Sequence, residues 1–252
     1  MITVEIASYP KSGNTWVRRL TEDYLSQLAG IDMHPLDIHS DSKLVKGREN
    51  AKFLPNVNND IFIYKSHIHN HPKIKPDKII HIYRHPLDVF CSAINYLNNH
   101  SNKMSLVRKN LIFRKGIPKS VEDIFTDGEM DYYFDAFFDE AGSNYWPDML
   151  DSNSNYFKYT RKALSSDITK SIKYEDLVND TKKVVNETMN AIFDLAENID
   201  IDTYTVDEKT KANRKTGFYW KAKPKVYTEF LTKEQVERFE SKYFQEMKFL
   251  GY

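Results

Sequence analysis

The feature that most constrains the fold is the order strand, loop, helix at the start of the chain. Residues 2–8 are apolar and partly β-branched, which predicts a short buried strand. A loop containing Pro, Gly and Asn follows, and residues 16–28 then place apolar side chains at helical spacing. Because a helix that follows a strand in this way needs a sheet to cover, the chain is predicted to begin with a βα unit.

The same alternation continues along the chain. Further strands are predicted at residues 61–65, 78–83 and 171–174, and further helices at residues 86–97 and 178–195. Pro86 suits the first turn of its helix, and Thr232 with Gln235 is typical of a capping box that starts a last helix reaching Phe244. Strands that alternate with helices predict an α/β fold with a central parallel sheet flanked by helices.

The middle of the chain is rich in aromatic residues and less periodic. Between about residues 98 and 159, rings occur among acids and asparagines at Tyr132, Tyr133, Phe134, Phe137, Phe138, Tyr145 and Trp146. We interpret this segment as helices and loops that cap the sheet, with the rings packed in a core or lining a pocket for a small molecule. Because no repeat, low-complexity tract or linker marks a boundary, we predict one domain over residues 1–252.

Composition excludes several classes of protein. The chain has 40% hydrophobic and 13% aromatic residues, which is enough for a packed core. Its 36 basic and 36 acidic residues balance, so no net field would attract nucleic acid or an anionic membrane. The single Cys91 cannot form an internal disulfide, no apolar run approaches the roughly 18 residues of a membrane span, and the first residues do not resemble a signal peptide. We therefore predict a cytoplasmic protein with neither nucleic-acid nor membrane partners.

The strongest motif links the first strand to the first helix. It reads Ser8-Tyr9-Pro10-Lys11-Ser12-Gly13-Asn14-Thr15-Trp16. Backbone N–H groups at the start of a helix, together with hydroxyls and a lysine, form a site that suits an anion. The positions of its glycine and lysine differ from those of a Walker A motif. A polar turn with a solvated lysine would also fit these residues taken alone.

A second motif follows the predicted strand at residues 78–83. Arg84 stands at the carboxyl end of that strand, and Ser92 comes eight residues later, two helical turns into the next element. An arginine at this place could bind a phosphate, because its guanidinium donates paired hydrogen bonds. The alternative is an ion pair at the surface between Arg84 and Asp88.

The third motif is Lys65 and His67, at the end of the predicted strand at residues 61–65. Parallel sheets bind ligands at the carboxyl ends of their strands, and the ordinary pKa of histidine suits a general base. His69 and His71 follow, so a metal site is an alternative interpretation. No carboxylate or cysteine accompanies these histidines at ligand spacing, and we therefore predict no metal.

Together the three motifs resemble the family of sulfotransferases that use 3′-phosphoadenosine 5′-phosphosulfate (PAPS), in particular its soluble cytosolic and bacterial members. Residues 9–16 are similar to the family's loop for the 5′-phosphosulfate, and residues 84–92 to its segment for the 3′-phosphate. Two further stretches agree with family elements, the run Tyr174-Glu175-Asp176-Leu177 and residues 230–239. The resemblance leaves only about residues 98–167 unmatched, and it implies a three-layer α/β sandwich like that of the P-loop kinases.

The resemblance also implies which residues bind the nucleotide. The 5′-phosphosulfate would be held by Lys11, Ser12, Gly13, Asn14 and Thr15. The rest of PAPS would be held by Trp16 and Tyr174 at the adenine and by Arg84 and Ser92 at the 3′-phosphate.

For the chemistry, the resemblance implies three residues. His67 would take the proton from the hydroxyl of the acceptor, while Lys11 and Lys65 would stabilise the charge that develops during transfer. Ser66 replaces the threonine of the family's Lys-Thr-His pattern. Sulfuryl transfer is an in-line displacement with a loose transition state, in which positioning and charge neutralisation matter most. The expected product of PAPS is 3′-phosphoadenosine 5′-phosphate (PAP).

The chain departs from the family pattern near its end. The family has an Arg-Lys-Gly loop at the 3′-phosphate, commonly followed by Gly-Asp-Trp-Lys. Here Arg214 and Lys215 are kept as predicted phosphate ligands, but Thr216 takes the place of the glycine, which is displaced to Gly217. Residues 222–229 read as an insertion at the family's usual dimer motif, so the sequence leaves a monomer and a homodimer equally open.

Two other functions are compatible with an anion loop. A nucleotide-phosphate kinase would need a Walker A motif and a carboxylate for Mg²⁺ after a strand, and neither is evident. A protein that binds PAPS or PAP without turnover would have no chemical reason to keep Lys11, Lys65 and His67. We therefore predict an enzyme with a small-molecule acceptor, which offers a hydroxyl or an amine and whose identity the sequence does not specify.

Overall fold

The computed structural model describes residues 1–30, 36–37, 51–140, 145–146, 150, 154–196, 198–201, 221 and 223–252. The chain divides into two compact units. The first unit comprises Met1–Arg84 and Lys162–Asn213, and the second comprises His85–Arg161 and Arg214–Tyr252.

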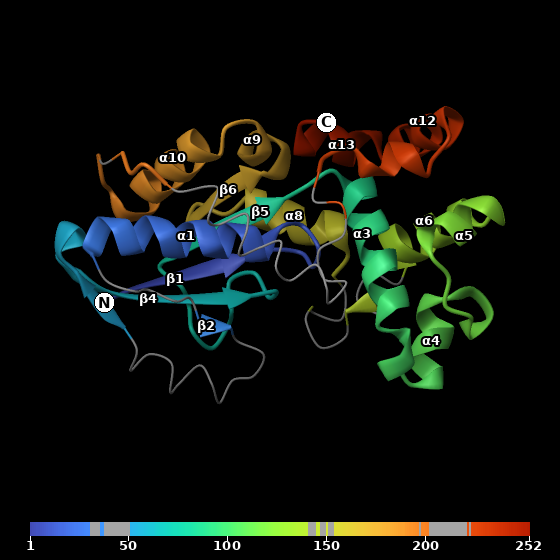
Figure 1. Ribbon diagram of the computed structural model, residues 1–252, viewed down its shortest axis with the longest axis horizontal. Helices are drawn as coiled ribbons and strands as arrows, with labels where there is room; N and C mark the ends of the chain where they lie inside the picture. The colour runs from blue at the N-terminus through green and yellow to red at the C-terminus, as the bar shows by residue number, and fades with distance from the viewer. Residues whose placement is uncertain are drawn as a thin grey trace. The chain divides into compact units, whose positions relative to one another are not determined.

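The first unit is built on one sheet of mostly parallel strands (Figure 1). Its strands are β1 (Ile2–Ala7), β2 (Leu36–Asp37), β3 (Lys52–Leu54), β4 (Asn59–Ser66), β5 (Lys78–Tyr83) and β6 (Thr169–Lys173). They lie in the order β2-β4-β1-β5-β6, and β3 pairs antiparallel with β4. The first strand of the chain therefore lies in the middle of the sheet, with parallel partners on both sides.

One face of this sheet is covered by helices α1 (Asn14–Ala29) and α10 (Thr181–Phe193), which contact each other. The inward residues of the strands alternate with period two, so Val4, Ile6 and Ile80 belong to the same apolar cluster as the buried face of these helices. The strands run nearly all apolar on this face because it is fully covered. This packing fixes the start of α1 directly after the carboxyl end of β1.

The other face of the sheet carries a different kind of side chain. Phe62 and Tyr64 of β4 pack there with Ile74, while Glu5 of β1 and His81 of β5 are fully buried on it. The alternation of the strands thus places apolar groups on one face and a mixture of rings and buried polar groups on the other.

The structure confirms the predicted α/β class and central sheet, and it corrects three boundaries. The strand predicted at residues 171–174 ends before Tyr174, which starts helix α9 (Tyr174–Asn179). The helix predicted at residues 178–195 is two helices, because Asp180 leaves helical geometry and its side chain accepts a hydrogen bond from the Lys183 N–H. The last predicted helix breaks at Tyr243 into α12 (Lys233–Lys242) and α13 (Phe244–Leu250).

The described part of the second unit is helical. It contains α3 (Pro86–Asn99), α4 (Leu106–Ile112), α5 (Val121–Thr126), α6 (Met130–Asp135), a π-helical turn (Ala136–Glu140), most of α8 (Tyr156–Leu164), α12 and α13. Short 3₁₀ helices lie at Ser101–Lys103, Arg114–Gly116 and Val226–Glu229. The predicted capping box of Thr232 and Gln235 is present at the start of α12.

The aromatic residues of the middle segment pack on one another in this unit. Phe138 makes ring contacts with Phe90, Phe157, Phe239 and Tyr243, at centroid distances of 5.0–6.2 Å. Such edge-on and tilted arrangements are the ones that aromatic rings prefer in a core. Of the two interpretations of this segment, packing in a core describes these rings.

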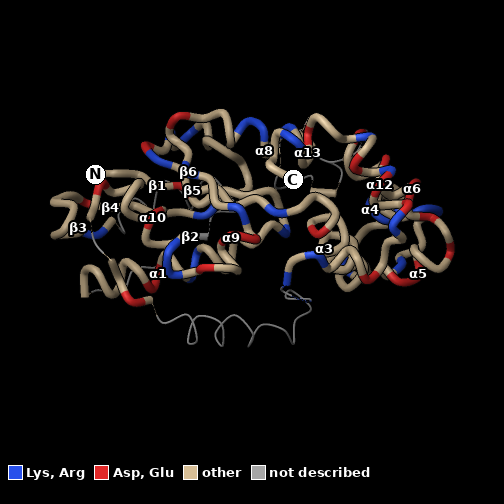
Figure 2. The backbone as a smooth tube through the Cα atoms, turned by 90° about the horizontal axis from the view of Figure 1, so that it is seen from above, with Lys and Arg blue, Asp and Glu red and all other residues tan. Residues whose placement is uncertain are grey.

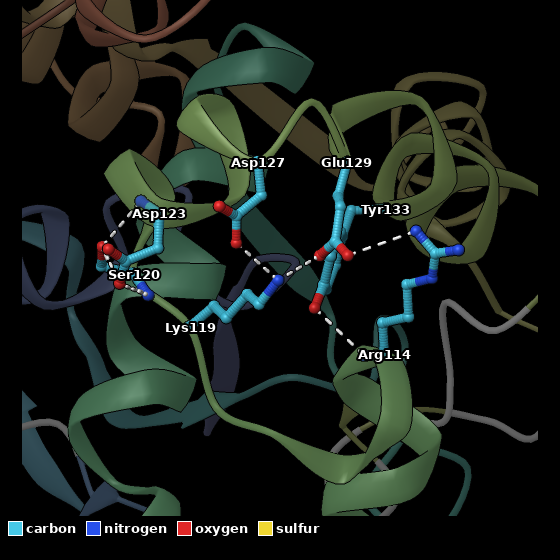
Figure 3. A network of polar contacts seen from close by, with 7 residues as sticks. All are labelled: Arg114, Lys119, Ser120, Asp123, Asp127, Glu129 and Tyr133. Atoms are coloured by element: carbon cyan, nitrogen blue, oxygen red, sulfur yellow. Dashed lines mark hydrogen bonds and ion pairs between the residues drawn. The ribbon is translucent and has the colours of Figure 1, made fainter.

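A polar network connects the segment before α5 with the start of α6 (Figure 3). The Lys119 ammonium lies 2.7 Å from both Asp127 and Glu129, and the Arg114 guanidinium pairs with Glu129 at 3.2 Å. The Tyr133 hydroxyl accepts a hydrogen bond from the Arg114 backbone N–H. A network in which one cation serves two carboxylates fixes the loop between the two short helices more firmly than an isolated surface pair would.

The distribution of charge and the length of the apolar helices can be followed in the part of the chain that is described. Figure 2 shows basic and acidic residues interspersed along the chain rather than collected at one end. None of the described helices is long and apolar enough to cross a bilayer.

Candidate active site

The loop between β1 and α1 has a strained geometry. Lys11 has φ 73° and Gly13 has φ 115°, which place both in the left-handed region of the backbone. The Ser12 N–H donates to the carbonyl oxygen of Tyr9 at 3.3 Å, and the Gly13 carbonyl accepts from the first turn of α1. A lysine in this region is uncommon and costs free energy, and such strain concentrates at functional sites.

Gly13 occupies a position where a side chain would be both crowded and strained. A Cβ atom there would lie 3.0 Å from the Cδ1 of Ile82 and 3.0 Å from a ring carbon of Tyr174. Together with its φ, this close approach explains why the loop needs glycine at the point where it enters the helix.

The start of α1 has the properties of an anion site. Gly13 caps the helix without a side-chain hydrogen bond, and the first turn contains no acidic residue. The Ser12 hydroxyl is buried, and no hydrogen-bond partner for it exists among the described residues. The Asn14 amide donates to the Ile6 carbonyl at 3.3 Å, which joins the helix to β1, while its buried oxygen has no partner in the described chain. An anion that accepts from the Ser12 hydroxyl would satisfy one of these buried groups.

Lys11 supplies the positive charge of this loop. Burial and, to a smaller extent, the nearby charge of Arg84 lower the pKa of its ammonium from 10.5 to about 7. Two cations held this close repel each other, and an anionic ligand between them would relieve the repulsion. The two positive charges are therefore energetically more favourable with an anion bound between them than in the free protein.

Arg84 lies at the carboxyl end of β5, where its side chain is buried. Its guanidinium stands 4.5 Å from the centroid of the Tyr174 ring, a cation–π contact. Tyr174 in turn makes an edge contact with Trp16, with ring centroids 5.8 Å apart. Three residues that the sequence predicts at the nucleotide are thus brought together from β5, α9 and α1.

Lys65 and His67 extend from the end of β4 beside the same loop. Ile61 and Ile63 pack under α1, so Lys65, two residues further along, projects from that face, opposite Ile6 of β1. His67 lies just beyond the strand, and its Nδ1 is 2.8 Å from the carbonyl oxygen of Ser8.

This contact determines which nitrogen of His67 can act as a base. A carbonyl oxygen only accepts, so Nδ1 must carry the hydrogen and donate it to Ser8. The Nε2 atom of the neutral ring is then the nitrogen that carries the lone pair, as the proton acceptor of a base must.

The remaining predicted residues are placed as follows. Thr15 is a partly buried residue of the first turn of α1. Ser92 is partly buried on α3, which belongs to the second unit. Arg214 and Lys215 lie outside the described residues.

The histidines that follow His67 form other contacts. His69 Nε2 lies 3.0 Å from the Thr169 hydroxyl, in a different direction from the bond between His67 and Ser8. Burial lowers the pKa of His69 to about 4, and the charge of Lys162 acts in the same direction, so this ring is neutral near pH 7. Within the described residues no three His, Cys, Asp or Glu side chains gather as a metal site would require.

Two buried acids belong to this region of the chain and were not predicted. The carboxylate of Asp88 accepts from the backbone N–H groups of Lys225 and Tyr227 at 2.8 and 3.1 Å. Glu5 is buried within β1 and accepts from the turn that follows β4. Glu5 could have been singled out from the sequence, because it is an acid in the middle of an otherwise apolar strand.

Comparison with known proteins gives the fold and the family. Mouse sulfotransferase SULT7A1, whose crystal structure is a complex with PAP, superposes with a TM-score of 0.56 at 15% identity, over 98% of this chain and 84% of the mouse chain. A retinol dehydratase in complex with retinol and PAP gives 0.53 at 13% identity, over 98% of this chain and 81% of its own. No curated protein sequence matches this chain significantly.

The comparison of sequence profiles is more specific than these superpositions. The profile of the sulfotransferase domain matches residues 2–251, nearly the whole chain. It therefore includes the loop of Lys11, the segment after β5 and the last helices. On this match the chain belongs to the sulfotransferase family of group-transfer enzymes.

Proposed function

We propose that this enzyme transfers the sulfuryl group of PAPS to a hydroxyl or amine of a small-molecule acceptor, and releases PAP. The observation that carries the proposal is the convergence of Lys11, Arg84 and His67 on one loop, whose buried Ser12 hydroxyl has no hydrogen-bond partner among the described residues. The two solved relatives described above were crystallised with PAP, which agrees with the same nucleotide for this chain.

Each residue would contribute one physical effect. The start of α1 with Ser12 and Lys11 would bind the 5′-phosphosulfate, and Arg84 would bind the 3′-phosphate. Trp16 and Tyr174 would present apolar ring surface to the adenine. Ser92, Thr15, Arg214 and Lys215 remain proposed ligands of the nucleotide.

The transfer step moves one proton and one sulfuryl group. The acceptor oxygen forms the new S–O bond as the bond between sulfur and the bridging oxygen of PAPS breaks, and Nε2 of His67 takes the proton of the acceptor hydroxyl. Lys11 and Lys65 would neutralise the charge that builds up on the oxygens around sulfur and on the leaving phosphate. The residues that we assign to this step need no metal ion.

The acceptor and the cellular location are proposed only as broad classes. The aromatic segment packs in a core, so the rings of the second unit do not by themselves define an acceptor class. We retain a small-molecule acceptor, one domain over residues 1–252 and a cytoplasmic location as proposals, since Cys91 is a free buried thiol and no described helix spans a membrane.

The test is a calorimetric titration of the purified protein with PAP, with ATP and the 3′-dephospho analogue as controls. Tight binding of PAP that depends on the 3′-phosphate, without Mg²⁺, would support the proposal, because Arg84 is assigned to that group. Binding of ATP that requires Mg²⁺, with none of PAP, would contradict it and favour a nucleotide-phosphate kinase.

A further inference from the structure

Glu5 occupies an unusual place for an acid. It lies in the middle of β1, opposite Tyr64 of β4 and Ile79 of β5, and its side chain is fully buried. It points to the face of the sheet away from α1, because Val4 and Ile6 on either side of it pack under that helix. An acid in the central strand of a sheet costs free energy unless its contacts compensate.

The carboxylate of Glu5 binds the turn that follows β4. Its Oε2 accepts from the backbone N–H of Asn70 at 2.9 Å and from that of His71 at 3.4 Å. Asn70 has φ 57°, a left-handed conformation that lets two consecutive N–H groups face one acceptor. The bonds join residues 65 and 66 positions apart in the chain.

This turn carries His67. Its first half is closed by the Ser66 hydroxyl, which accepts from the Ile68 N–H at 2.9 Å. Its second half is held by Glu5, by a hydrogen bond between the Thr169 hydroxyl and the His69 ring, and by Lys162, which donates to the His69 carbonyl oxygen at 3.4 Å. The His67 ring, at the start of this turn, contacts the carbonyl oxygen of Ser8, which lies just after β1.

These contacts use only one of the two oxygens of the Glu5 side chain. Its Oε1 is buried without a hydrogen-bond partner among the described residues. Burial accordingly raises the pKa of Glu5 from 4.5 to about 8, although the N–H groups of His71 and Asn70, the Ser66 hydroxyl and the charge of Lys162 all act to lower it. Valine or isoleucine would suit this buried strand position better, so stability does not explain the acid.

We propose that Glu5 is a positioning residue for His67: by binding the Asn70 and His71 N–H groups, it holds the turn in the conformation that places Nδ1 of His67 on the Ser8 carbonyl and directs Nε2 to the acceptor. Glu5 itself touches neither substrate, because it lies on the opposite face of the sheet from α1. The inference rests on the proposed role of His67 as the base.

A pair of conservative variants separates reach from ionisation. Glu5→Gln keeps the length and an acceptor oxygen but cannot ionise, whereas Glu5→Asp keeps the carboxyl group but shortens the side chain by about 1.5 Å, one bond length. Since β1 is fixed between β4 and β5, the shorter side chain cannot follow the turn. We expect kcat to fall at least about tenfold in Glu5→Asp with little change in the KM for PAPS, and to stay within about threefold in Glu5→Gln.

The tautomer of His67 gives a readout that does not depend on turnover. In protein labelled with ¹⁵N-histidine, the His67 ring of the parent and of Glu5→Gln should be in the form that carries hydrogen on Nδ1. In Glu5→Asp the signals should shift toward a mixture with the form protonated on Nε2, which predominates in free imidazole side chains. Tyr24→Phe is the matched control, because it removes the hydrogen bond that the buried Tyr24 donates to Asn190 on the other face of the sheet.

Each outcome decides the proposal. Equal losses in Glu5→Gln and Glu5→Asp, or an unchanged tautomer in both, would overturn it, as would a loss in Tyr24→Phe as large as that in Glu5→Asp. If Glu5→Asp does not fold, Glu5→Val removes the acceptor with a good strand former and should give the same loss of kcat and the same tautomer change. A parent protein that shows no sulfuryl transfer would refute the proposed function, while the tautomer comparison would still test Glu5.

Discussion

The guanidinium of Arg84 lies 4.5 Å from the centroid of the Tyr174 ring. The contact joins the end of β5 to the start of α9, and Tyr174 extends it to Trp16 at the start of α1. A buried arginine that rests on an aromatic face is held in place before any phosphate binds, so less conformational freedom is lost on binding.

Replacing Tyr174 should therefore weaken nucleotide binding through the ring. We expect Tyr174→Leu to raise the Kd for PAP by about tenfold, from the loss of a cation–π contact worth about 0.5–2 kcal/mol and of ring surface for the adenine. Tyr174→Phe keeps the ring and should stay within about twofold of the parent. Equal losses in both variants, measured by calorimetry, would show that the hydroxyl is the important group.

Removing the proposed base should affect turnover and spare binding. His67→Ala should lower kcat by about 10² to 10⁴ with a hydroxyl acceptor, since its Nε2 is the assigned proton acceptor, while the Kd for PAP changes little. His100→Ala, which removes a ring bonded only locally to the Tyr96 carbonyl, serves as control. Turnover unchanged in His67→Ala would remove this residue from the mechanism.

The lowered pKa of Lys11 predicts that nucleotide affinity depends on pH. The free enzyme loses the Lys11 proton near pH 7, and a bound anion raises this pKa, so binding above pH 7 takes up a proton. The affinity for PAP should fall by up to about tenfold per pH unit above 7. Lys11→Arg stays charged and should abolish this slope. Calorimetry in two buffers of different ionisation enthalpy counts the protons, and an uptake that persists in Lys11→Arg would assign it to another group.

A methyl group at Gly13 should be costly for two separable reasons. Gly13→Ala should destabilise the fold by about 2–4 kcal/mol, because its φ is 115° and the Cβ would meet Ile82 and Tyr174 at 3.0 Å. Gly30→Ala, with φ 64° and no atom of the described residues within 4 Å of the Cβ, should cost only about 1 kcal/mol. Adding Ile82→Val removes the Cδ1 atom and should recover part of the loss, as measured by urea unfolding.

The free energy of unfolding should decrease as the pH rises, because of Glu5. Its pKa is raised to about 8 in the folded state, so between about pH 4.5 and 8 the folded protein binds more protons than the unfolded chain, and this difference destabilises the fold as pH rises. Lys162 is the charged group that opposes the shift. Glu5→Gln lacks the titration and should gain on the order of 3 kcal/mol relative to the parent between pH 5 and pH 8.5. Parallel pH profiles of the two proteins in urea unfolding would contradict this.

The sequence predicts those parts of the fold whose signal is local. The strand at residues 78–83 has the predicted bounds because its apolar run is closed on both sides by polar residues. The split between α9 and α10 depends on a single capping aspartate, Asp180, inside a segment whose periodicity is otherwise continuous. Periodicity cannot locate such a break, whereas a side chain that competes for the backbone N–H can cause one.

The same contrast between local and long-range signals applies to the candidate site. Local patterns locate Lys11, Arg84 and His67, because each stands at the end of a predicted strand. The contacts of Gly13 with Ile82 and Tyr174, and of Glu5 with Asn70, depend on which strands become neighbours, and no local pattern contains that information.

The central position of β1 has a consequence for the order in which the protein can be made. β1 precedes both of its neighbours in the sheet along the chain, and these neighbours, β4 and β5, end only at Ser66 and Tyr83. The loop of Lys11 is therefore synthesised before the strands that support it. The contact of Gly13 with Tyr174 can form only later still. Assembly of this loop is thus coupled to synthesis of the chain as far as Tyr174.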